Sequence, residues 1–438
     1  MKEYYLLGHE GKVPFQLPEE WRVLKNAVLK SVPAEKGVYE LTEEALDNPV
    51  GTPRIEEMIG PGDKVAIILD DATRPTPRRE MLECLLERLE GCGVGPDRID
   101  LVFALGTHRP LTEREVEGLL GTELKRKLRY HQHDCKSREL VSVGTLRAAG
   151  EVKIHPVVAG ADFRIALGSI LPHPMNGFGG GAKIILPGVA NEKAIQDHHT
   201  ALLVSKGLAF GRLEGNPFRD EINEAGRLSR LDFILNAVYN ASEQVKGIVA
   251  GDLDKAHAHG AEWTLKECSA TFDEPADVSI VSAFPHLEGP QVTKPLGPAT
   301  MITREGGTVI LYSSAIHGGG FPEPLLQAFD TAFGLCKNGD TKGLILDFLK
   351  RRELIVPSAP MDFNCALDLT LLYLSRIKVV MVCRDVNQEQ AERLGFSYAP
   401  SLEEAIAFVS REKPVATVNI LPSGGLAIPI VKEPVIFH

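Results

Sequence analysis

Three mostly apolar runs in the first half of the chain each end in polar side chains, and segments of helical periodicity separate them. The runs are Val65–Leu69, Leu101–Leu105 and Ile165–Leu171, and they lead into Asp70-Asp71, Gly106-Thr107-His108 and Pro172-His173. Buried strands joined by helices form largely parallel sheets, which bind ligands at the carboxyl ends of their strands. The pattern therefore predicts an α/β fold whose functional side chains follow the strand ends.

The helical segments have recognisable starts. Apolar residues at three-to-four spacing predict a helix over residues 77–90. Thr112 with Glu115 has the sequence of a capping box, and Asn216 followed by Pro217 combines a cap residue with a first-turn proline. The sequence therefore predicts two further helices that begin directly after Thr112 and Asn216.

The second half of the chain carries another strand–helix series. Strands are predicted at residues 278–283, 308–312 and 377–383. Residues 415–420 and 427–431 are expected to form a hairpin, and Pro429 would confine its second arm to a sheet edge.

A chain of 438 residues is long for one core and suits two domains. We expect an N-terminal cofactor-binding α/β domain at residues 1–270 and a C-terminal substrate-side α/β domain at residues 276–413. Residues 414–438 are expected to pack back on the first domain. Each domain would contain a largely parallel or mixed sheet flanked by helices, with the active site in the cleft between the two domains.

Composition argues against several classes of protein. The 48 basic and 59 acidic residues give a net charge of −11, and no basic cluster provides a nucleic-acid surface. No apolar run approaches the roughly 20 residues of a membrane span, and the charged start lacks the apolar stretch of a signal peptide. The seven cysteines are scattered without a C-x-x-C pair. We therefore expect a cytoplasmic protein that binds neither nucleic acid nor membranes.

Residues 179–183 read Gly-Gly-Gly-Ala-Lys. This is not a Walker A phosphate loop, because Ala182 separates the glycines from Lys183 and no Ser or Thr follows the lysine. From the residues alone, two interpretations stay open. The segment is either a flexible loop with a solvated lysine, or a backbone that approaches a phosphate or a flat cofactor closely.

Several histidines are candidates for chemistry. His108 follows an apolar run, and His173 lies between two prolines whose rings restrict the backbone and hold the imidazole in place. His198 and His199 are adjacent, so on a helix only one of them can face a given site. Each histidine could instead be a hydrogen-bonded structural residue.

Two other histidine pairs are weaker candidates. His131 and His133 would share a strand face, and we interpret them as surface residues. His257 and His259 lie two apart on a predicted helix, where their side chains diverge, so they would be poor co-ligands of a metal.

Charged and polar groups cluster at two further places. Asp71, Thr73 and Arg74 supply a carboxylate, a hydroxyl and a guanidinium at a strand end, and the planar arginine fork suits a carboxylate or phosphate. The alternative is a salt-bridged turn. Gln291 and Lys294 follow a predicted strand of the second domain and could supply a second cationic contact.

Taken together and in this order, these segments resemble the nickel-pincer lactate racemase family. The motifs are Asp-Ala-Thr-Arg-Pro at 71–75, Gly-Thr-His-Arg at 106–109, His-Pro at 173–174, Gly-Gly-Gly-Ala-Lys at 179–183, the later His199, and Gln-x-x-Lys at 291–294. The resemblance covers most of the chain. It implies an isomerase: a racemase or epimerase of a small 2-hydroxy acid.

The resemblance also implies a role for each residue. The cofactor would be a nickel-pincer nucleotide, a pyridinium bis-thiocarboxylate mononucleotide made by separate biosynthetic enzymes. Lys183 would carry it covalently and His199 would bind the nickel, while His108 and His173 would form the acid/base pair. The cofactor would contact Asp71, Ala72, Thr73 and Arg74, and the substrate would contact Arg74, Gln291 and Lys294.

Chemistry makes this division of labour sensible. Direct deprotonation of the α-carbon by imidazole faces a mismatch of about 20 pKa units, or about 28 kcal/mol at ~1.4 kcal/mol each. That exceeds the ~8–23 kcal/mol that enzymes typically supply. Moving the hydrogen as hydride to a cofactor, while a histidine takes the hydroxyl proton, avoids the carbanion. Returning the hydride to the other face of the planar 2-keto acid inverts the centre, and each enantiomer's hydroxyl then needs its own histidine.

The second domain departs from the family pattern. Lactate racemases of this family place a tryptophan near the substrate, but the tryptophans of this chain are Trp21 and Trp263, and residues 354–364 offer Phe363 at best. Pro290 also stands before Gln291, where the family tends to carry an aromatic residue. A 2-hydroxy acid other than lactate, such as malate or an aliphatic or sugar acid, is therefore at least as well suited. The oligomeric state stays open.

Two alternatives come from other functional classes. One is a mononuclear metal-dependent hydrolase in which His108, His173 and His199 bind zinc and leave a position open for water. This enzyme would not need Lys183. The other is a non-enzymatic protein that binds an organic acid or a nucleotide.

Overall fold

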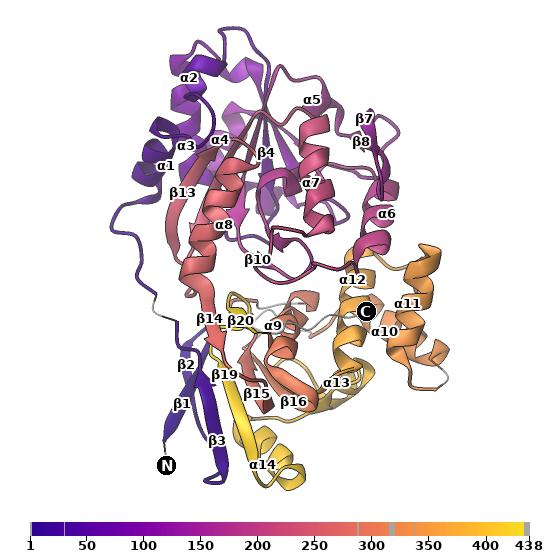
Figure 1. Ribbon diagram of the computed structural model, residues 1–438. Coiled ribbons are helices and arrows are strands. Elements are labelled where there is room, and N and C mark those ends of the chain that lie inside the picture. The colour runs from indigo at the N-terminus through magenta and orange to yellow at the C-terminus, as the bar shows by residue number, and fades with distance from the viewer. Residues whose placement is uncertain (1, 30, 287–288, 315–319, 337, 433–438) are drawn as a thin grey trace. The chain divides into compact units, whose positions relative to one another are not determined.

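The computed structural model describes residues 2–29, 31–286, 289–314, 320–336 and 338–432. The chain divides into two compact units (Figure 1). Residues 31–267 form one, here called the central unit, and residues 1–30 together with 268–438 form the other, the composite unit. The expected boundary near residue 270 is therefore close to the observed one, but the first 30 residues belong with the C-terminal part of the chain.

The central unit is built on a six-stranded sheet in the order β13-β12-β9-β4-β5-β6. All neighbours are parallel except β12 and β13, which are antiparallel. The strands are β4 (Val65–Asp70), β5 (Ile99–Ala104), β6 (Arg129–Gln132), β9 (Phe163–Ile170), β12 (Phe233–Tyr239) and β13 (Val245–Gly251). Two small hairpins accompany the sheet: β7 (Val141–Leu146) with β8 (Gly150–Ile154), and β10 (Pro172–His173) with β11 (Gly177–Phe178).

Helices cover both faces of this sheet (Figure 1). They are α1 (Val38–Asp47), α2 (Ile55–Met58), α3 (Arg78–Gly91), α4 (Glu113–Lys127), α5 (Pro156–Ala159), α6 (Glu192–Leu202), α7 (Pro217–Leu228) and α8 (Lys255–Cys268). Alternate strand residues such as Ile67 and Leu101 share a core with α1 to α4. On the other face α8 packs so closely that a Cβ at Gly260 would lie 2.4 Å from the Ile170 side chain.

The composite unit contains a second six-stranded sheet, ordered β18-β17-β16-β15-β19-β3 and parallel throughout. Its strands are β3 (Trp21–Asn26), β15 (Ala276–Ser282), β16 (Thr303–Ser313), β17 (Lys378–Cys383), β18 (Ser397–Tyr398) and β19 (Ala416–Leu421). β1 (Glu3–Gly8) pairs with β2 (Gly11–Gln16), and β14 (Ser269–Phe272) with β20 (Ile428–Val431). The helices are α9 (Leu296–Met301), α10 (Glu323–Leu335), α11 (Thr341–Arg351), α12 (Met361–Leu374), α13 (Gln388–Arg393) and α14 (Leu402–Glu412).

The structure confirms most of the predicted elements of the central unit. The capping box is complete, since Thr112 accepts from the Glu115 backbone and the Glu115 side chain accepts from the Thr112 backbone. The Asn216 side chain likewise accepts from the first turn of α7. Local hydrogen-bonding capacity is enough to define such helix starts.

The prediction for the tail was wrong. Residues 415–420 and 427–431 were expected to form a hairpin that packs with the rest of 414–438 on the first domain, but β19 lies between β15 and β3 inside the composite sheet, and β20 pairs in parallel with β14. Residues 433–438 lie outside the described residues. The sequence of an apolar run predicts a strand, but it does not indicate whether that strand pairs with the next strand or with a distant one. Pro429 does lie in a two-stranded pair, where it occupies an edge.

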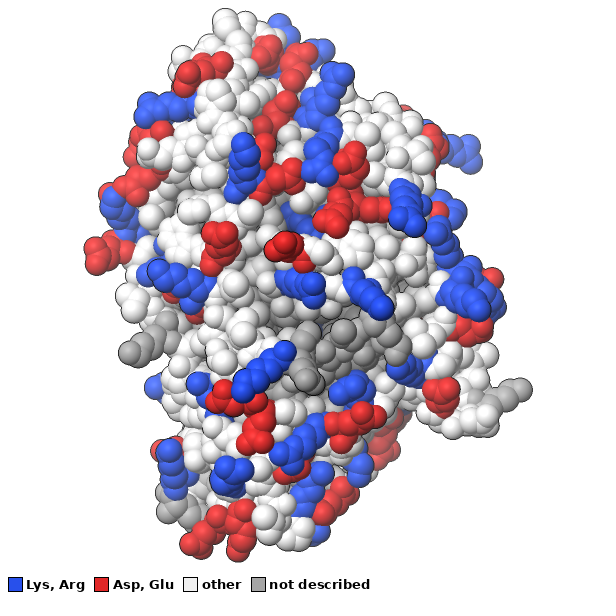
Figure 2. Space-filling model, viewed as in Figure 1, with Lys and Arg blue, Asp and Glu red and all other residues white. Residues whose placement is uncertain are grey.

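The helix lengths and the charged side chains on the surface are consistent with the predicted α/β fold class. Within the described ranges, none of the helices combines the length and apolar character needed to cross a bilayer. On the face shown in Figure 2, acidic and basic side chains are interspersed.

Candidate active site

The central strands of the central unit place three candidate segments at one edge. β9, β4 and β5 are neighbours and parallel, with Leu69 opposite Leu167 and Asp70 opposite Ala104. Their carboxyl ends therefore meet at the same edge of the sheet. Asp71 directly follows β4, and His108 and His173 follow β5 and β9, as the sequence pattern predicted.

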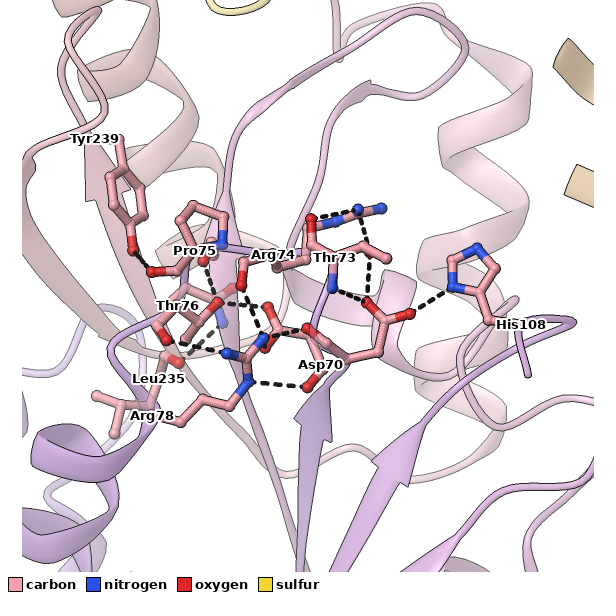
Figure 3. Close-up of polar contacts among 12 residues, drawn as sticks. Asp70, Thr73, Arg74, Pro75, Thr76, Arg78, His108, Leu235 and Tyr239 are labelled. Atoms are coloured by element: carbon pink, nitrogen blue, oxygen red, sulfur yellow. Dashed lines mark hydrogen bonds and ion pairs between the residues drawn. The ribbon is translucent and has the colours of Figure 1, made fainter. Parts of the chain in front are cut away.

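Asp71 and His108 form a hydrogen-bonded pair at this edge (Figure 3). The contact joins the Asp71 carboxylate to Nδ1 of His108. Asp71 is buried, whereas the His108 side chain is 29% exposed and can be reached by a ligand. In Figure 3 the second ring nitrogen of His108, Nε2, points away from the dashed line that ends on Nδ1. The pair therefore joins a shielded carboxylate to an accessible imidazole.

The ionisation of Asp71 follows from its partners. Burial would raise the pKa of its carboxyl, but hydrogen bonds from His108 and Thr73 and the charge of Arg74 outweigh burial and hold that pKa well below its usual range. An ionised Asp71 accepts the Nδ1 hydrogen of His108, and this leaves the lone pair on Nε2. His108 is thereby oriented as a base.

The turn after β4 also presents a cation. Thr73 donates to Asp71 through its backbone N–H at 3.1 Å and its hydroxyl at 2.5 Å. Arg74 donates to the Thr73 hydroxyl at 2.8 Å and is half-buried, while Ala72 is exposed. The carboxylate is thus directed at His108, and the guanidinium lies beside the hydroxyl at the surface of the turn.

Backbone groups help to hold the His173 ring. His173 ends β10, and its Nδ1 accepts from the backbone N–H groups of Met175 at 3.3 Å and Asn176 at 3.5 Å. The ring is buried. Nδ1 therefore faces this short hairpin, and the role of His173 as an acid/base group stays a prediction.

Buried side chains hold the backbone of the glycine segment. Three consecutive carbonyl groups accept from them: Arg219 of α7 donates to Phe178 at 3.3 Å and to Gly180 at 3.2 Å, and His257 of α8 donates to Gly179 at 2.8 Å. The N–H of Gly181 donates to Asn236 of β12 at 2.8 Å. Three elements of the fold therefore fix this loop.

The glycines are needed for packing against protein. Gly180 and Gly181 have φ of +75° and +58°, which L side chains rarely adopt. A Cβ at Gly180 would lie 2.9 Å from the Asn236 side chain, and one at Gly181 would lie 2.7 Å from His257. These close contacts are with the loop's own scaffold, and close approach of the loop to a phosphate or a flat cofactor stays a prediction.

This scaffold leads directly to Lys183 and His199. Lys183 lies in the short 3₁₀ turn Gly181–Ile184 and is half-buried. Burial lowers the pKa of His199 to about 4, and the charge of Lys183 adds to this effect, so the lysine amine lies within electrostatic reach of the imidazole. The structure thus brings these two predicted site residues together.

α6 separates the roles of its two adjacent histidines. His199 donates from Nδ1 to the Ile195 carbonyl at 2.8 Å, which leaves the Nε2 lone pair for a metal. His198 is fully buried and donates from Nε2 to the Phe218 carbonyl at 3.1 Å. The neutral, backbone-oriented His199 has the features of a metal ligand, whereas His198 is structural.

The substrate-side residues lie in the composite unit, which is described by itself. Gln291 is in the 3₁₀ turn Gly289–Thr293 after β15, and the Lys294 N–H donates to the Gln291 carbonyl at 3.1 Å. The two residues are therefore one turn apart. Phe363 is half-buried in the first turn of α12, and Trp21 is buried in β3. The roles of Gln291 and Lys294 stay predictions.

Sequence reasoning missed the residues that hold the site in place. Arg78, Asn236 and Arg219 are buried polar side chains without a motif of their own. The one sequence signal was Asn236 within the otherwise apolar strand β12, since Arg78 and Arg219 lie in helices with many other charged residues. His133 was also misjudged: it is buried and donates to the Ala190 carbonyl at 2.9 Å, because the chain folds back over the end of β6.

The described part of the chain argues against the zinc hydrolase. No group of three or more His, Cys, Asp or Glu side chains there could hold a metal ion. His108, His173 and His199 therefore do not form a three-histidine site. One protein imidazole at His199 instead fits a metal whose other ligands belong to an organic cofactor.

Comparison with known proteins points to one family. The family model of the lactate racemase N-terminal domain matches residues 8–211. Lactate racemase from Lactiplantibacillus plantarum is 30% identical over 395 residues, which are 88% of this chain and 89% of that protein. Lactate racemase from Thermoanaerobacterium thermosaccharolyticum is 28% identical over 426 residues, or 95% and 96% of the two chains.

Solved structures agree with the sequence comparisons. The lactate racemase apoprotein from Thermoanaerobacterium thermosaccharolyticum matches with a TM-score of 0.87 over 99% of this chain and 100% of that chain, at 28% identity. A crystal structure of a protein from Thermotoga maritima matches with a TM-score of 0.66 over 92% and 100% of the two chains. At 20% identity it is similar in fold alone. The predicted α/β fold class is confirmed.

Proposed function

The chain belongs to the lactate racemase family, and from that premise we propose that it racemises or epimerises a 2-hydroxy acid with a nickel-pincer nucleotide held at Lys183 and His199. As a member of this family it is an isomerase that acts on a small 2-hydroxy acid. The observation that carries the proposal is the Asp71–His108 pair, an accessible imidazole oriented by an ionised carboxylate.

The residues present fit the implied cofactor. His199 has a neutral ring, a bonded Nδ1 and an available Nε2, as a nickel ligand requires. The Lys183 amine lies near it, at the end of a loop with fixed backbone geometry. These features support attachment of the pincer at Lys183 and coordination of nickel by His199.

Such a cofactor, when bound, would accept a hydride from the α-carbon and return it. The protein's part is to move the hydroxyl proton. His108 would take the proton from the hydroxyl of one enantiomer at Nε2, and Asp71 would stabilise the imidazolium that forms. His173 would serve the hydroxyl of the other enantiomer. The planar 2-keto acid between these two steps explains how the centre is inverted.

Cationic side chains would hold the substrate carboxylate. Arg74 offers a guanidinium at the turn surface, and we propose that Gln291 and Lys294 add an amide and an ammonium. The chain's tryptophans, Trp21 and Trp263, belong to β3 and α8, and residues 354–364 contain none. This departure supports a substrate other than lactate, such as malate or an aliphatic or sugar acid. None of the seven cysteines, which all lie among the described residues, forms a disulfide, and this supports a cytoplasmic location.

The test is co-expression with the cofactor-making enzymes, followed by a racemisation screen over single enantiomers of 2-hydroxy acids. We expect loss of optical rotation with at least one acid, bound nickel, and a cofactor adduct in the intact mass. Lys183→Ala should abolish the adduct and the racemisation. Activity of Lys183→Ala with added zinc would instead support a hydrolase. Saturable binding without a change of chirality would support a non-enzymatic binding protein.

A further inference from the structure

We propose that Arg78 is a positioning residue for the Asp71–His108 pair, because its guanidinium shapes the turn of residues 70–76 that directs Asp71 at His108. The inference rests on the proposed function only for the role of His108 as an acid/base group. The positioning itself can be tested in the protein without cofactor or substrate.

The contacts of Arg78 cover the whole turn (Figure 3). Arg78 is the first residue of α3 and is buried. Its Nε donates to the Asp70 carbonyl at 2.9 Å, its Nη1 donates to the Thr76 carbonyl at 3.1 Å, and its Nη2 donates to the carbonyl groups of Asp71 and of Arg74, the latter at 3.1 Å. One rigid side chain thus bonds four backbone carbonyl groups within seven residues.

Two consecutive carboxylates of the turn have separate tasks. Asp70 faces inward, where its carboxylate lies 2.8 Å from Nη2 of Arg78 and accepts from the Thr76 hydroxyl at 2.6 Å. Asp71 faces the other way, toward His108. Burial raises the pKa of Asp70, and the charge of Arg78 opposes this rise. Arg78 therefore pairs with the structural carboxylate and leaves Asp71 for the imidazole.

Neighbouring strands hold the far end of the turn. The Tyr239 hydroxyl, at the end of β12, donates to the Pro75 carbonyl at 2.6 Å. The Thr76 hydroxyl also contacts the hydroxyl of Ser169 on β9. The turn that carries Asp71 is therefore anchored to β9 and β12 as well as to β4, the strand that it follows.

Lysine cannot replace this geometry. Arg78→Lys keeps a positive charge opposite Asp70, but a compact ammonium lacks the planar fork that reaches four carbonyl groups. We expect the turn to loosen and the Asp71–His108 hydrogen bond to lose occupancy. Altering a residue that orients a functional side chain typically changes activity by about 10–100-fold.

The experiment measures the His108 tautomer by ¹⁵N NMR on the cofactor-free, histidine-labelled protein, with His108→Gln to assign the signal. Wild type should show His108 with hydrogen on Nδ1, and Arg78→Lys should show a mixture of tautomers. Arg79→Lys is the matched control, because Arg79 is the next residue of α3, its side chain is 59% exposed, and it donates to the Glu83 carboxylate at 2.9 Å. It should leave the His108 signal unchanged.

Racemisation by the loaded enzyme is the second readout. We expect kcat of Arg78→Lys to fall by about 10–100-fold, with a smaller change in KM. A lower melting temperature with an unchanged His108 tautomer would make Arg78 merely structural and overturn the proposal. If Arg78→Lys changes the His108 tautomer but the wild-type enzyme racemises no hydroxy acid, the positioning role of Arg78 stands. The proposed function would then be wrong.

A second variant covers the case in which Arg78→Lys does not fold. Tyr239→Phe keeps the ring and removes the hydroxyl that donates to Pro75, and so releases the other end of the same turn. We expect a smaller shift of the His108 tautomer in the same direction. An unchanged tautomer in this folded variant would also count against the proposal.

Discussion

The turn of residues 70–76 and the glycine loop of residues 178–181 each present functional groups at the same sheet edge, and each is bonded by a buried arginine. Arg78 bonds four carbonyl groups and has a carboxylate partner in Asp70. Arg219 bonds two carbonyl groups, and burial lowers its pKa to about 9. The first segment is shaped by charged groups, whereas the second is shaped by close packing.

This difference predicts how each segment fails. The turn should tolerate added volume at its exposed positions but not the loss of a specific polar group. The glycine loop should tolerate no added volume, because its backbone touches β9, β12 and α8. Two substitutions and one change of pH test this contrast, and they are given from the largest expected effect to the smallest.

Gly180→Ala should destabilise the central unit by about 2–4 kcal/mol, since it combines a strained positive φ with overpacking. The new Cβ would lie 2.8 Å from Ile170 and 2.9 Å from the Ser169 carbonyl oxygen. Thermal unfolding measures the loss, and intact mass measures cofactor attachment at Lys183. Gly118→Ala is the control: it lies in α4 with no atom within 4 Å, and alanine should raise stability there by about 0.5–1 kcal/mol. Equal melting temperatures for the two variants would contradict the packing argument.

Asp71→Asn should lower kcat/KM for racemisation by about 10–100-fold, and the melting temperature should also fall because the ionised carboxylate stabilises the folded protein at neutral pH. The amide can no longer stabilise a positively charged His108, although it fills the same space. Steady-state kinetics with each enantiomer measure the effect. Asp97→Asn is the control, because Asp97 is 82% exposed and its ion pair with Arg98 spans 3.9 Å. Full activity in Asp71→Asn would remove Asp71 from the mechanism.

Mild acid should weaken the central unit near the glycine loop and not at the turn. The folded-state pKa of His199 is about 4, below its ordinary value of 6.5, so the unfolded chain takes up the proton first and stability falls as the pH drops from 6.5 toward 4. Between about pH 7 and about pH 5.5 the loss should be about 1 kcal/mol for this group. Asp71 has a lowered pKa, so its contribution is kept in that range and is lost only at more acidic pH.

Urea unfolding of wild type and His199→Gln at the two pH values measures this difference. The variant should lose about 1 kcal/mol less than wild type between them. Identical losses would show that His199 takes up its proton equally in the folded and unfolded protein. This is the smallest of the three effects.

Local patterns were sufficient to predict the parts of the site that follow strand ends. Asp71 and His108 were predicted because an apolar run followed by a polar residue has the same meaning wherever its neighbours lie. The pairing of β19 with β3 could not be predicted in this way, since it joins the two ends of the chain. The same holds for Asn236 and Arg219, whose partners in the glycine loop are distant in sequence. The apolar run around Asn236 indicates that this residue is buried, but it does not indicate which N–H group the side chain accepts from. The charged residues around Arg219 give no such indication.

The membership of β3 in the composite sheet has a consequence for how the protein is made. β3 emerges from the ribosome among the first segments, but its partner β19 is among the last. Because domains fold as units during synthesis, the central unit can finish folding as an insert before the edge strand β3 has a partner strand to pair with. Translation that stops before residue 416 would yield a folded central unit joined to an unfinished sheet.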